Sequence, residues 1–312
     1  MQRRLIAIVG PTAAGKSAIA LELARRLGGE IVNADSRQIY RGMDIGTAKP
    51  SLDDRRDARH HLYDIADPGE TYSLALYRKD ARAAFEAIWA RGSFPWLVGG
   101  TGQYAWALLE DWQVPEVAPQ DALRAELTAF AAERGTGALH ARLAMVDPVA
   151  AGRIDARNVR RVVRAIEVHD VTGTPISEWQ AKGKPDFEFL LFGVAAERQE
   201  LDRRIDQRVE AMFEAGFVDE VRRLLAAGVP ADAPAMSSIG YGEVVRHLGG
   251  EISLEEAKDL TARATRRLAR RQWQWFRPED RRIRWVRTAD DIDLEANIFT
   301  GACTNVIRGE RR

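Results

Sequence analysis

Short apolar runs and amphipathic segments alternate along the first hundred residues. The amphipathic segments have apolar side chains at helical spacing and are each followed by a glycine, which predicts helices over residues 17–27 and 77–91. The apolar runs are typical of parallel strands covered on both faces. They predict strands over residues 5–9, 30–34, 94–98 and 189–194. Strands alternating with helices in this way indicate an α/β domain with a parallel sheet.

The rest of the chain has a different pattern. Residues 121–171 are rich in alanine and helical in pattern, and a segment marked by glycine and proline follows at 172–185. Residues 198–276 are again mostly helical. We therefore predict an α/β core interrupted by an all-helical insertion. The expected boundaries are 1–114 for the first part of the core, 115–185 for the insertion, and 186–312 for the continued core with C-terminal helices.

Composition and charge exclude several classes of protein. The 312 residues include 46 Lys and Arg and 46 Asp and Glu, so the chain is not basic all over, although a basic face is still allowed. No apolar run approaches the roughly 18 residues of a membrane span, and the first apolar run breaks at Gly10 before a signal sequence forms. The single cysteine, Cys303, excludes an internal disulfide. These features predict a cytoplasmic protein without a membrane partner.

A phosphate-binding loop of the form G-x-x-x-x-G-K-[ST] follows the first predicted strand and opens the first predicted helix, as that motif requires. Its residues are Gly10, Pro11, Thr12, Ala13, Ala14, Gly15, Lys16 and Ser17. The glycines let backbone N–H groups turn toward an anion, Lys16 adds a full charge, and the Ser17 hydroxyl is a ligand for Mg²⁺. We predict a P-loop NTPase-like, nucleotide-kinase-like fold that binds a diphosphate or triphosphate group.

The P-loop alone does not decide the reaction. NTPases and kinases usually end a strand in an acid that helps to hold Mg²⁺, but the run at 94–98 ends in Gly99-Gly100. The run at 30–34 is the one that ends in an acid, Asp35. From the residues alone, Asp35 is a metal ligand, a base aimed at a substrate, or a cap for the following turn.

A longer set of motifs narrows the choice. Residues 35–50 (DSRQIYRGMDIGTAKP) resemble the signature of the bacterial tRNA dimethylallyltransferases, the tRNA isopentenyltransferase or IPP transferase family. The resemblance covers nearly the whole chain, in the same order and at a length normal for the family. It continues in HHLYDI at 60–65, GGTGQY at 99–104, NVRRVVRAIEV at 158–168, IGY at 239–241 and TRRLARRQ at 265–272.

The resemblance implies transfer of a dimethylallyl group from dimethylallyl diphosphate to N6 of the adenine 3′-adjacent to the anticodon in tRNA, with release of diphosphate. It implies that Asp35 is the general base toward N6, that Thr101 contacts diphosphate and nucleotide, and that Arg208 clamps the diphosphate. The P-loop would hold the diphosphate, with Ser17 on Mg²⁺. The tRNA contacts implied are Asp35, Ser36, Arg37, Gln38, Arg160, Arg161, Arg164, Ser238, Gly240 and Tyr241.

Two features of these motifs stay open. Gln103 stands where the family more usually has an apolar residue after GGTG, which puts the contacts of that loop in doubt. His60 is either a neighbour of the active site or an ordinary hydrogen-bonded histidine, as is His61. A metal-binding histidine pair is not expected, because no further ligands have the spacing of a metal site.

Arginines concentrate on two predicted helix faces. One face is predicted from Arg153, Arg157, Arg160, Arg161 and Arg164, and the other from Arg263, Arg266, Arg267 and Arg270, next to an apolar stripe of Leu260, Ala264, Leu268 and Trp275. Such faces suit RNA phosphates, although a solvated arginine face is the alternative for each. Trp273, Trp275 and Phe276 either stack on bases or, as we expect, pack into the core.

The expected partners are the anticodon stem-loop of tRNA, gripped by the insertion, and a small-molecule diphosphate; the chain is expected to be a monomer. Three other functions are open: a small-molecule kinase, a non-catalytic RNA-binding module switched by a nucleotide, and an isopentenyltransferase acting on free adenine nucleotides. The missing strand-end acid disfavours the kinase. The arginine faces and the insertion disfavour the enzyme of free nucleotides.

Overall fold

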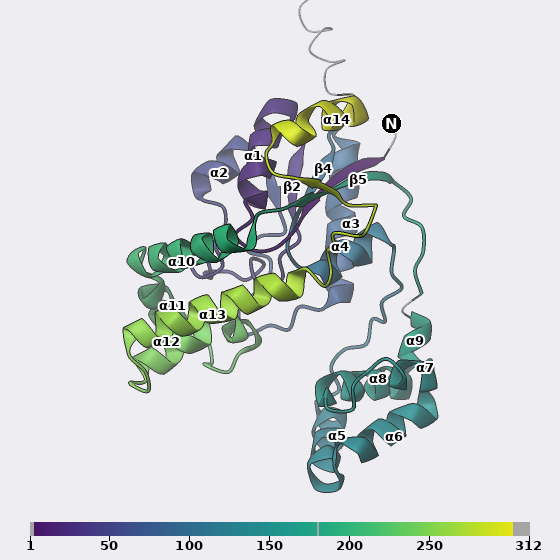
Figure 1. The fold of residues 1–312 in the computed structure, drawn as a ribbon. Helices are drawn as coiled ribbons and strands as arrows, with labels where there is room; N and C mark the ends of the chain where they lie inside the picture. Colours follow the sequence, from purple (N-terminus) through teal and green to yellow (C-terminus); the bar gives the residue numbers. More distant parts are fainter. Residues whose placement is uncertain (1–2, 180, 302–312) are drawn as a thin grey trace, which may run out of the picture. The chain divides into compact units, whose positions relative to one another are not determined.

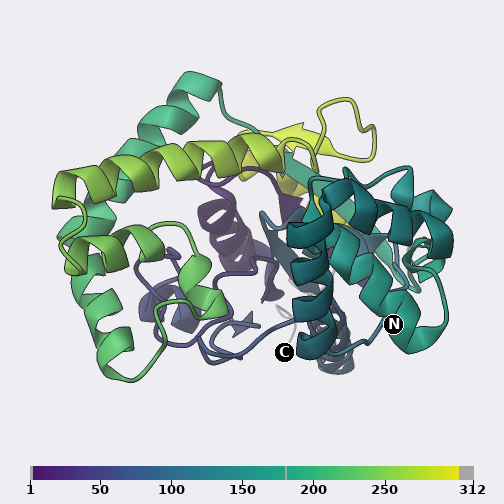
Figure 2. The ribbon, with the colours of Figure 1, turned by 90° about the horizontal axis from the view of Figure 1, so that it is seen from below.

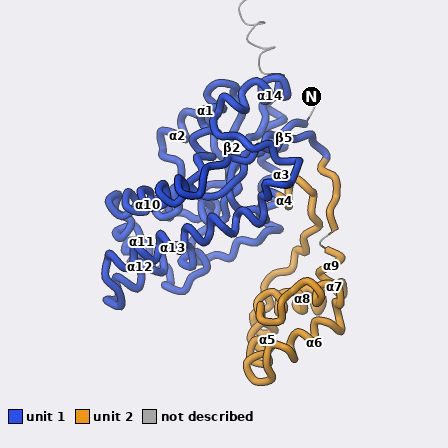
Figure 3. Tube along the Cα trace, in the orientation of Figure 1, with its two compact units in different colours: residues 1–105, 186–312 blue, residues 106–185 orange. Residues whose placement is uncertain are grey.

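The computed structural model describes residues 3–179 and 181–301, so Cys303 lies outside the described residues. The chain divides into two compact units, residues 1–105 with 186–312, and residues 106–185 (Figure 3). The second unit begins earlier than the predicted boundary at 115, because its outgoing and returning segments bond to each other. Gln113 N–H donates to the Ala181 carbonyl, and Gly183 N–H donates to the Glu110 carbonyl.

The first unit is built on a six-stranded parallel sheet with the strand order β3-β2-β4-β1-β5-β6. The strands are β1 (Arg4–Val9), β2 (Glu30–Asn33), β3 (His60–His61), β4 (Pro95–Gly99), β5 (Glu188–Val194) and β6 (Arg284–Val286). The α/β prediction and its four strands are confirmed. The pattern did not predict β3 and β6, because two or three residues are too few to show a periodicity.

Helices cover both faces of this sheet (Figure 1). The described helices before residue 115 and after residue 185 are α1 (Lys16–Leu27), α2 (Leu52–Asp57), α3 (Leu74–Ala90), α4 (Gly102–Leu109), α10 (Arg198–Glu214), α11 (Phe217–Ala226), α12 (Tyr241–Leu248), α13 (Leu254–Gln272) and α14 (Asp290–Thr300), with a 3₁₀ turn at Pro234–Ser237. Helix α3 begins three residues before the predicted start because Ser73 caps it, its hydroxyl accepting from Leu76 N–H.

The strands are continuous apolar runs in the sequence because helices pack against both faces of the sheet. Ile6 and Ile8 join a core cluster with Ile19 and Leu23 of α1, and α14 packs beside them. The alternate side chains of β1 are equally buried on the other face, where α3 packs against β2 and β4. The parallel pairing of β4 with β1 and with β2 makes the carboxyl ends of these three strands neighbours at one edge of the sheet.

The C-terminal helices form a second packed group within the first unit. Helix α13 runs alongside α10 and α12, as the two views in Figures 1 and 2 show. Phe217, Tyr241 and Val244 pack there with Ile39 and Met43 from the segment that follows β2. The family-like segment at 35–50 is therefore anchored in the core of this helix group.

In the described residues of the second unit, all regular secondary structure is helical. Besides the end of α4, its helices are α5 (Asp121–Arg134), α6 (Thr136–Val146), α7 (Pro148–Ala151), α8 (Val159–Thr172) and α9 (Ile176–Trp179). Buried leucine and valine side chains from α5, α6 and α8 form its core. Asp147 is buried beside them; its carboxylate caps α7 at Ala150 N–H and accepts from the Ser177 N–H and hydroxyl. Across the described part of the chain, no helix is both long and apolar enough to cross a membrane.

Candidate active site

The P-loop connects β1 to α1 in the predicted place. Gly10 has φ +137°, and a side chain there would come within 2.7 Å of the Val194 carbonyl oxygen, so the close passage of this loop along β5 requires glycine. Lys16 is buried at the start of α1, and its Nζ donates to the Pro11 carbonyl at 2.7 Å. Burial lowers the pKa of Lys16 to about 8; the Asp35 carboxylate opposes this shift and the Arg208 guanidinium adds to it.

Asp35 follows β2 and shapes its own turn. Its N–H donates to Asn33 Oδ1 at 2.9 Å, and its Oδ1 accepts from Arg37 N–H at 2.8 Å. Among the described residues, its second oxygen makes no hydrogen bond. The capping alternative therefore accounts for one carboxylate oxygen and leaves the other for a ligand, with the side chain half-buried.

The loop after β4 meets the Asp35 turn directly. The Thr101 hydroxyl accepts from Ser36 N–H at 3.0 Å and donates to Ser36 Oγ at 3.3 Å. The Thr101 N–H donates to the Ala34 carbonyl at 3.1 Å. These contacts follow from the strand order, because β2 and β4 are adjacent and parallel, and loops at the carboxyl ends of such strands converge. Gln103, next in this loop, is exposed on the first turn of α4.

Arg208 reaches the P-loop from α10. Its NH1 lies 3.5 Å from Thr12 Oγ1, and burial lowers its pKa below the usual value while Asp35 opposes that shift. An arginine stays charged under such a shift. Arg208 also lines a cavity of about 750 Å³ between α10 and the segment that follows β2, together with apolar side chains such as Ile45 and Met212. The structure thus brings Asp35, Thr101, Lys16 and Arg208 to one edge of the sheet.

Gln272, at the end of α13, ties the two phosphate-facing loops together. Its Oε1 accepts from Thr12 N–H at 2.7 Å, and its Nε2 donates to the Gly100 carbonyl at 2.9 Å. A side chain at Gly100 would meet that Nε2 at 2.3 Å. The sequence pattern indicates no role for Gln272 beyond its place at the end of a motif, because both partners are more than 170 residues away.

Arg37 and Gln38 contact other parts of the protein. Arg37 NH1 lies 3.4 Å from the Pro234 carbonyl. Gln38 Nε2 donates to the carbonyls of Thr47 and Ala48 at 2.9 and 3.0 Å, so this amide group shapes its own segment. Both side chains are half-buried and lie next to Asp35 in the sequence.

The segment 238–241, implied to contact tRNA, is bonded into the helix core. Ser238 is buried and its hydroxyl donates to the Ala235 carbonyl, while Tyr241 is fully buried and its hydroxyl donates to Glu220 Oε1 at 2.6 Å. The Gly240 N–H donates to the Glu243 carboxylate at 2.8 Å. These groups hold the helix core together, and the tRNA contacts implied for this segment stay a prediction.

The first arginine face is also corrected. Helix α8 begins after its cap, Asn158, so Arg153 and Arg157 precede it and do not share its face. Arg157 pairs with Asp155 at 2.6 Å. Arg164 pairs with the buried Glu167 at 2.6 Å, which takes up part of its guanidinium. Arg160 and Arg161 are exposed, and within the described residues no ion pair engages them.

On the second arginine face, too, some of the arginines form ion pairs within the protein. On α13, Arg263 pairs with Asp259 at 3.6 Å, and Arg266 pairs with Asp206 of α10. Arg267 and Arg270 are exposed and, within the described residues, without an ion pair. At its end Phe276 is buried and Trp273 stacks on Trp285 with ring centroids 5.0 Å apart, as expected for core packing. Trp275 departs from that expectation, because it lies beyond the last turn of α13 and is 41% exposed.

Metal-binding side chains do not gather in the described residues: no group of three or more His, Cys, Asp or Glu is placed to hold an ion. Ser17, exposed on the first turn of α1, offers a single hydroxyl. His60 donates from Nδ1 to the Ala58 carbonyl at 2.7 Å, and His61 pairs with Glu30 at 2.7 Å. The two histidines are thus hydrogen-bonded residues of β3, the edge strand next to β2.

Comparison with known proteins gives one consistent family. Residues 38–279 match the family model described as IPP transferase, and residues 3–64 match one described as isopentenyl transferase. A tRNA dimethylallyltransferase of Thermomicrobium roseum is 50% identical over 276 residues, covering 88% of this chain and 84% of that protein.

Solved structures agree with that match. The crystal structure of a full-length tRNA isopentenylpyrophosphate transferase from Bacillus halodurans is 38% identical with a TM-score of 0.69, and both chains are covered completely. The structure of a eukaryotic dimethylallyltransferase acting on tRNA is 25% identical with a TM-score of 0.78, covering 100% of this chain and 81% of that one.

Proposed function

Because this chain belongs to the IPP transferase family, it transfers a dimethylallyl group to an adenine of tRNA, and we propose that the acceptor atom is N6 of the adenine 3′-adjacent to the anticodon. The donor is dimethylallyl diphosphate. We propose that the enzyme acts as a monomer in the cytoplasm. The observation that best supports the site is the convergence of Asp35, Thr101, Lys16 and Arg208 at one edge of the sheet.

The reaction forms one bond and breaks one. N6 of the adenine attacks C1 of the prenyl group, the bond between C1 and the diphosphate oxygen breaks, and the N6 proton passes to the free oxygen of Asp35. A base is needed because the lone pair of the exocyclic amine is delocalised into the purine ring. The target base has to leave the stack to reach this site, at a cost of a few kcal/mol. Thr101 contacts both the nucleotide and the diphosphate.

The leaving diphosphate is stabilised by cations and N–H groups that are in position before the reaction. Lys16 and Arg208 supply two positive charges, and the P-loop N–H groups at the start of α1 supply the rest. A single Ser17 hydroxyl suits Mg²⁺, which takes most of its oxygen ligands from phosphates and water. When bound there, the ion would neutralise negative charge on the leaving group. Because β4 ends in Gly99 and not in an acid, the loop favours loss of diphosphate over phosphoryl transfer.

The helical unit 106–185 is proposed to grip the anticodon stem-loop. Arg160 and Arg161 on α8 are among its exposed cations that form no ion pair in the described residues, and Arg267 and Arg270 on α13 in the first unit are of the same kind. Cations of this kind bind the RNA backbone by releasing condensed counterions. Arg37, beside Asp35, is proposed to contact the nucleotides around the target.

The function is tested by incubating the enzyme with dimethylallyl diphosphate labelled in its prenyl group. We expect label in an anticodon stem-loop and none in AMP, because AMP lacks the phosphate backbone that the arginines bind. A stem-loop with hypoxanthine at the target position has no exocyclic amine and serves as the control. Label in AMP alone, or equal label in the hypoxanthine stem-loop, would contradict the proposal.

Replacing both Arg160 and Arg161 by alanine is expected to weaken tRNA binding and to lower its salt dependence. Each lost phosphate contact flattens the plot of log affinity against log salt by somewhat under one unit, so the double variant should lose about 1.5 units of slope. Affinity for dimethylallyl diphosphate should not change. Fluorescence anisotropy with a labelled stem-loop over a range of salt concentrations measures both quantities.

The matched control removes two arginines that already pair on the surface, Arg203 with Glu200 and Arg222 with Asp219. It changes the net charge equally and is expected to leave the slope unchanged. A folded Arg160/Arg161 variant, verified by thermal melting, that binds tRNA with the wild-type slope would remove α8 from the RNA-binding surface.

A further inference from the structure

The segment that follows Asp35 is held on one side by a buried carboxylate. Glu220 of α11 is 2% exposed, and its oxygens accept from three consecutive N–H groups, those of Asp44, Ile45 and Gly46, at 2.9, 2.7 and 3.2 Å. The Tyr241 hydroxyl donates to the same carboxylate at 2.6 Å. This fixes the backbone of residues 44–46 to the helix core, but it leaves the rest of the segment to be held by other groups.

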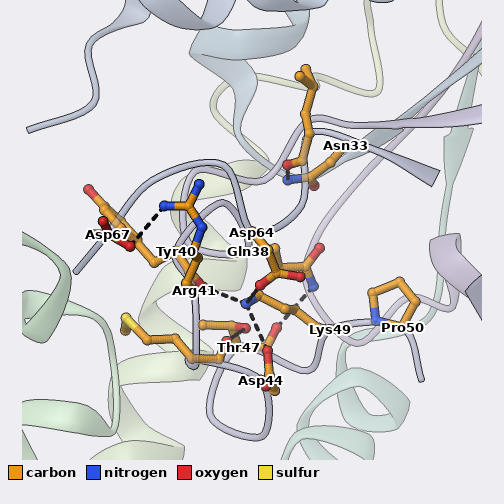
Figure 4. Close-up of polar contacts among 12 residues, drawn as sticks. Asn33, Gln38, Tyr40, Arg41, Asp44, Thr47, Lys49, Pro50, Asp64 and Asp67 are labelled. Carbon is orange, nitrogen blue, oxygen red and sulfur yellow. Dashed lines mark hydrogen bonds and ion pairs between the residues drawn. The ribbon is translucent and has the colours of Figure 1, made fainter. Parts of the chain in front are cut away.

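Lys49 holds the other side of the segment (Figure 4). Its side chain is 1% exposed, and its ammonium group donates to the Tyr40 carbonyl, to Asp44 Oδ1 at 2.8 Å and to Asp64 Oδ1 at 2.6 Å. All three donors of the ammonium group are therefore used. Arg55 donates to the second oxygen of Asp64 at 2.7 Å. Burial alone would raise the pKa of Asp64, but Lys49 and Arg55 hold it below its usual value.

The Lys49–Asp64 contact completes a closed circuit around Asp35, made of hydrogen bonds and the short backbone stretches between them. On one branch Gln38, three residues after Asp35, bonds to the carbonyls of Thr47 and Ala48, next to Lys49. On the other branch Asn33 Nδ2 donates at 3.0 Å both to the Leu62 carbonyl, near Asp64, and to the Asp35 carbonyl. The ion pair joins these two branches at one end, and backbone bonds from the Ile65 and Ala66 N–H groups to the Ile39 carbonyl join the same segments further along.

The backbone around this junction is strained on both sides of the ion pair. Ala48, Leu62 and Asp64 all have positive φ, at 51°, 64° and 55°, although none is glycine. Such residues cost free energy and persist only where the surrounding contacts over-determine them. The Lys49–Asp64 pair is a charged contact between these two strained stretches.

We propose that Lys49 is a positioning residue for the transfer: its buried ion pair with Asp64 closes the circuit that keeps Asp35, Arg37 and Gln38 in the geometry that receives the target adenine. All three ammonium donors of Lys49 are bonded within the protein, so Lys49 acts through the segment that it holds. The inference rests on the proposed function, and it concerns the acceptor side of the site only. The P-loop and Arg208, which bind the diphosphate, are outside the circuit.

The test compares Lys49→Met with wild type in single-turnover transfer to an anticodon stem-loop. Methionine has a similar length but no donors, so the circuit opens while the volume is kept. Misplacing a reacting group by about 1 Å costs on the order of 10²-fold in rate, and we expect a loss of that size. Affinity for inorganic diphosphate should stay within twofold of wild type. A rate like that of wild type in the folded variant, or a parallel loss of diphosphate affinity, would overturn the inference.

The chain offers a matched control in Lys258, which also pairs with two carboxylates, those of Glu210 and Glu255, but lies on α13 outside the circuit. Lys258→Met should transfer at the wild-type rate. If wild type and Lys258→Met both fail to label the stem-loop, the proposed function fails and not this inference. An equal loss of rate in both lysine variants would overturn the inference, because the effect would then be general.

Asp64→Asn is the second variant, and it keeps the test decisive if Lys49→Met does not fold. It retains the shape of the side chain and removes the charge, so it should also lower the rate. Combined with Lys49→Met, where that variant folds, it should cost no more than a further factor of two, because both changes break the same contact. A folded Asp64→Asn enzyme with the wild-type rate, or fully multiplicative losses in the double variant, would contradict the circuit.

Discussion

Replacing Asp35 by asparagine is expected to slow prenyl transfer by about 10²–10⁴-fold, the range observed when a general base is removed. Asparagine keeps an oxygen that accepts from Arg37 N–H, the contact made by Oδ1 at 2.8 Å, so the turn after β2 is retained. It cannot take the proton from N6. Affinity for tRNA should therefore be largely kept while the chemical step is lost, which single-turnover transfer and stem-loop binding measure separately.

Two companion variants make this result interpretable. Asp35→Ala also removes the turn contact, so any rate difference from Asp35→Asn reports the contribution of the turn. Asp67→Asn applies the same chemical change to an exposed aspartate that pairs with Arg41, and it should leave the rate unchanged. Wild-type single-turnover rates in both Asp35 variants would exclude this residue as the base.

Replacing Lys16 by methionine is expected to weaken diphosphate binding by roughly 10–150-fold, which corresponds to about 1.5–3 kcal/mol for one charge-assisted contact. The wild-type affinity should also depend on pH. The pKa of Lys16 is lowered to about 8, mainly by burial, and the anion binds its protonated form. Affinity is thus full below that pH and decreases as the pH rises through it. Calorimetric titration with inorganic diphosphate from pH 6.5 to 9.5 measures this decrease.

The variants of the two cations should behave differently with pH. Lys16→Met loses the decrease that begins near pH 8 and keeps only the titration of diphosphate itself. Arg208→Ala binds more weakly too, but it keeps the decrease and moves it to higher pH, because Arg208 contributes to lowering the pKa of Lys16. If inorganic diphosphate inhibits prenyl transfer by the Lys16→Met enzyme as strongly as transfer by wild type at pH 7, Lys16 is not part of the diphosphate site.

The features that could be predicted from the sequence are those that depend on neighbouring residues. The strands at 5–9 and 94–98 are apolar because both faces of the sheet are packed, and the P-loop is recognisable because strand, glycines, Lys16 and helix are consecutive. Asp35 could be singled out because it directly follows a strand. The order of the strands then brings the loops together, as parallel connections require.

The arginine faces show where local patterns fail. Helical spacing joined Arg153 and Arg157 to α8, but the chain there is a turn that ends at the Asn158 cap. Arg266 has the spacing of a solvent-facing cation, yet it pairs with Asp206, 60 residues earlier in the chain. Helical spacing predicts which residues would share one side of a helix. It does not predict at which residue the helix begins or which elements pack against it.

Motif membership likewise identified Ser238 and Tyr241 without revealing their position. Tyr241 is fully buried and bonds to Glu220, so it belongs to the support of the active-site segment and not to its surface. A sequence motif shows which residue type occupies a position, but not what that residue does there. Packing residues and binding residues both belong to such motifs.

The fold class, the phosphate-binding loop and the carboxylate that follows β2 can be predicted from the amino-acid sequence, because periodicity and consecutive motifs encode them. The contacts of Gln272, Glu220 and Lys49, and which arginines form ion pairs, become visible in the folded chain. Gln272 spans 172 residues to Gly100, and Glu220 spans 176 to Asp44. Such contacts form when distant elements pack and bury polar groups that must then be satisfied, and no local pattern in the chain specifies which partner satisfies them.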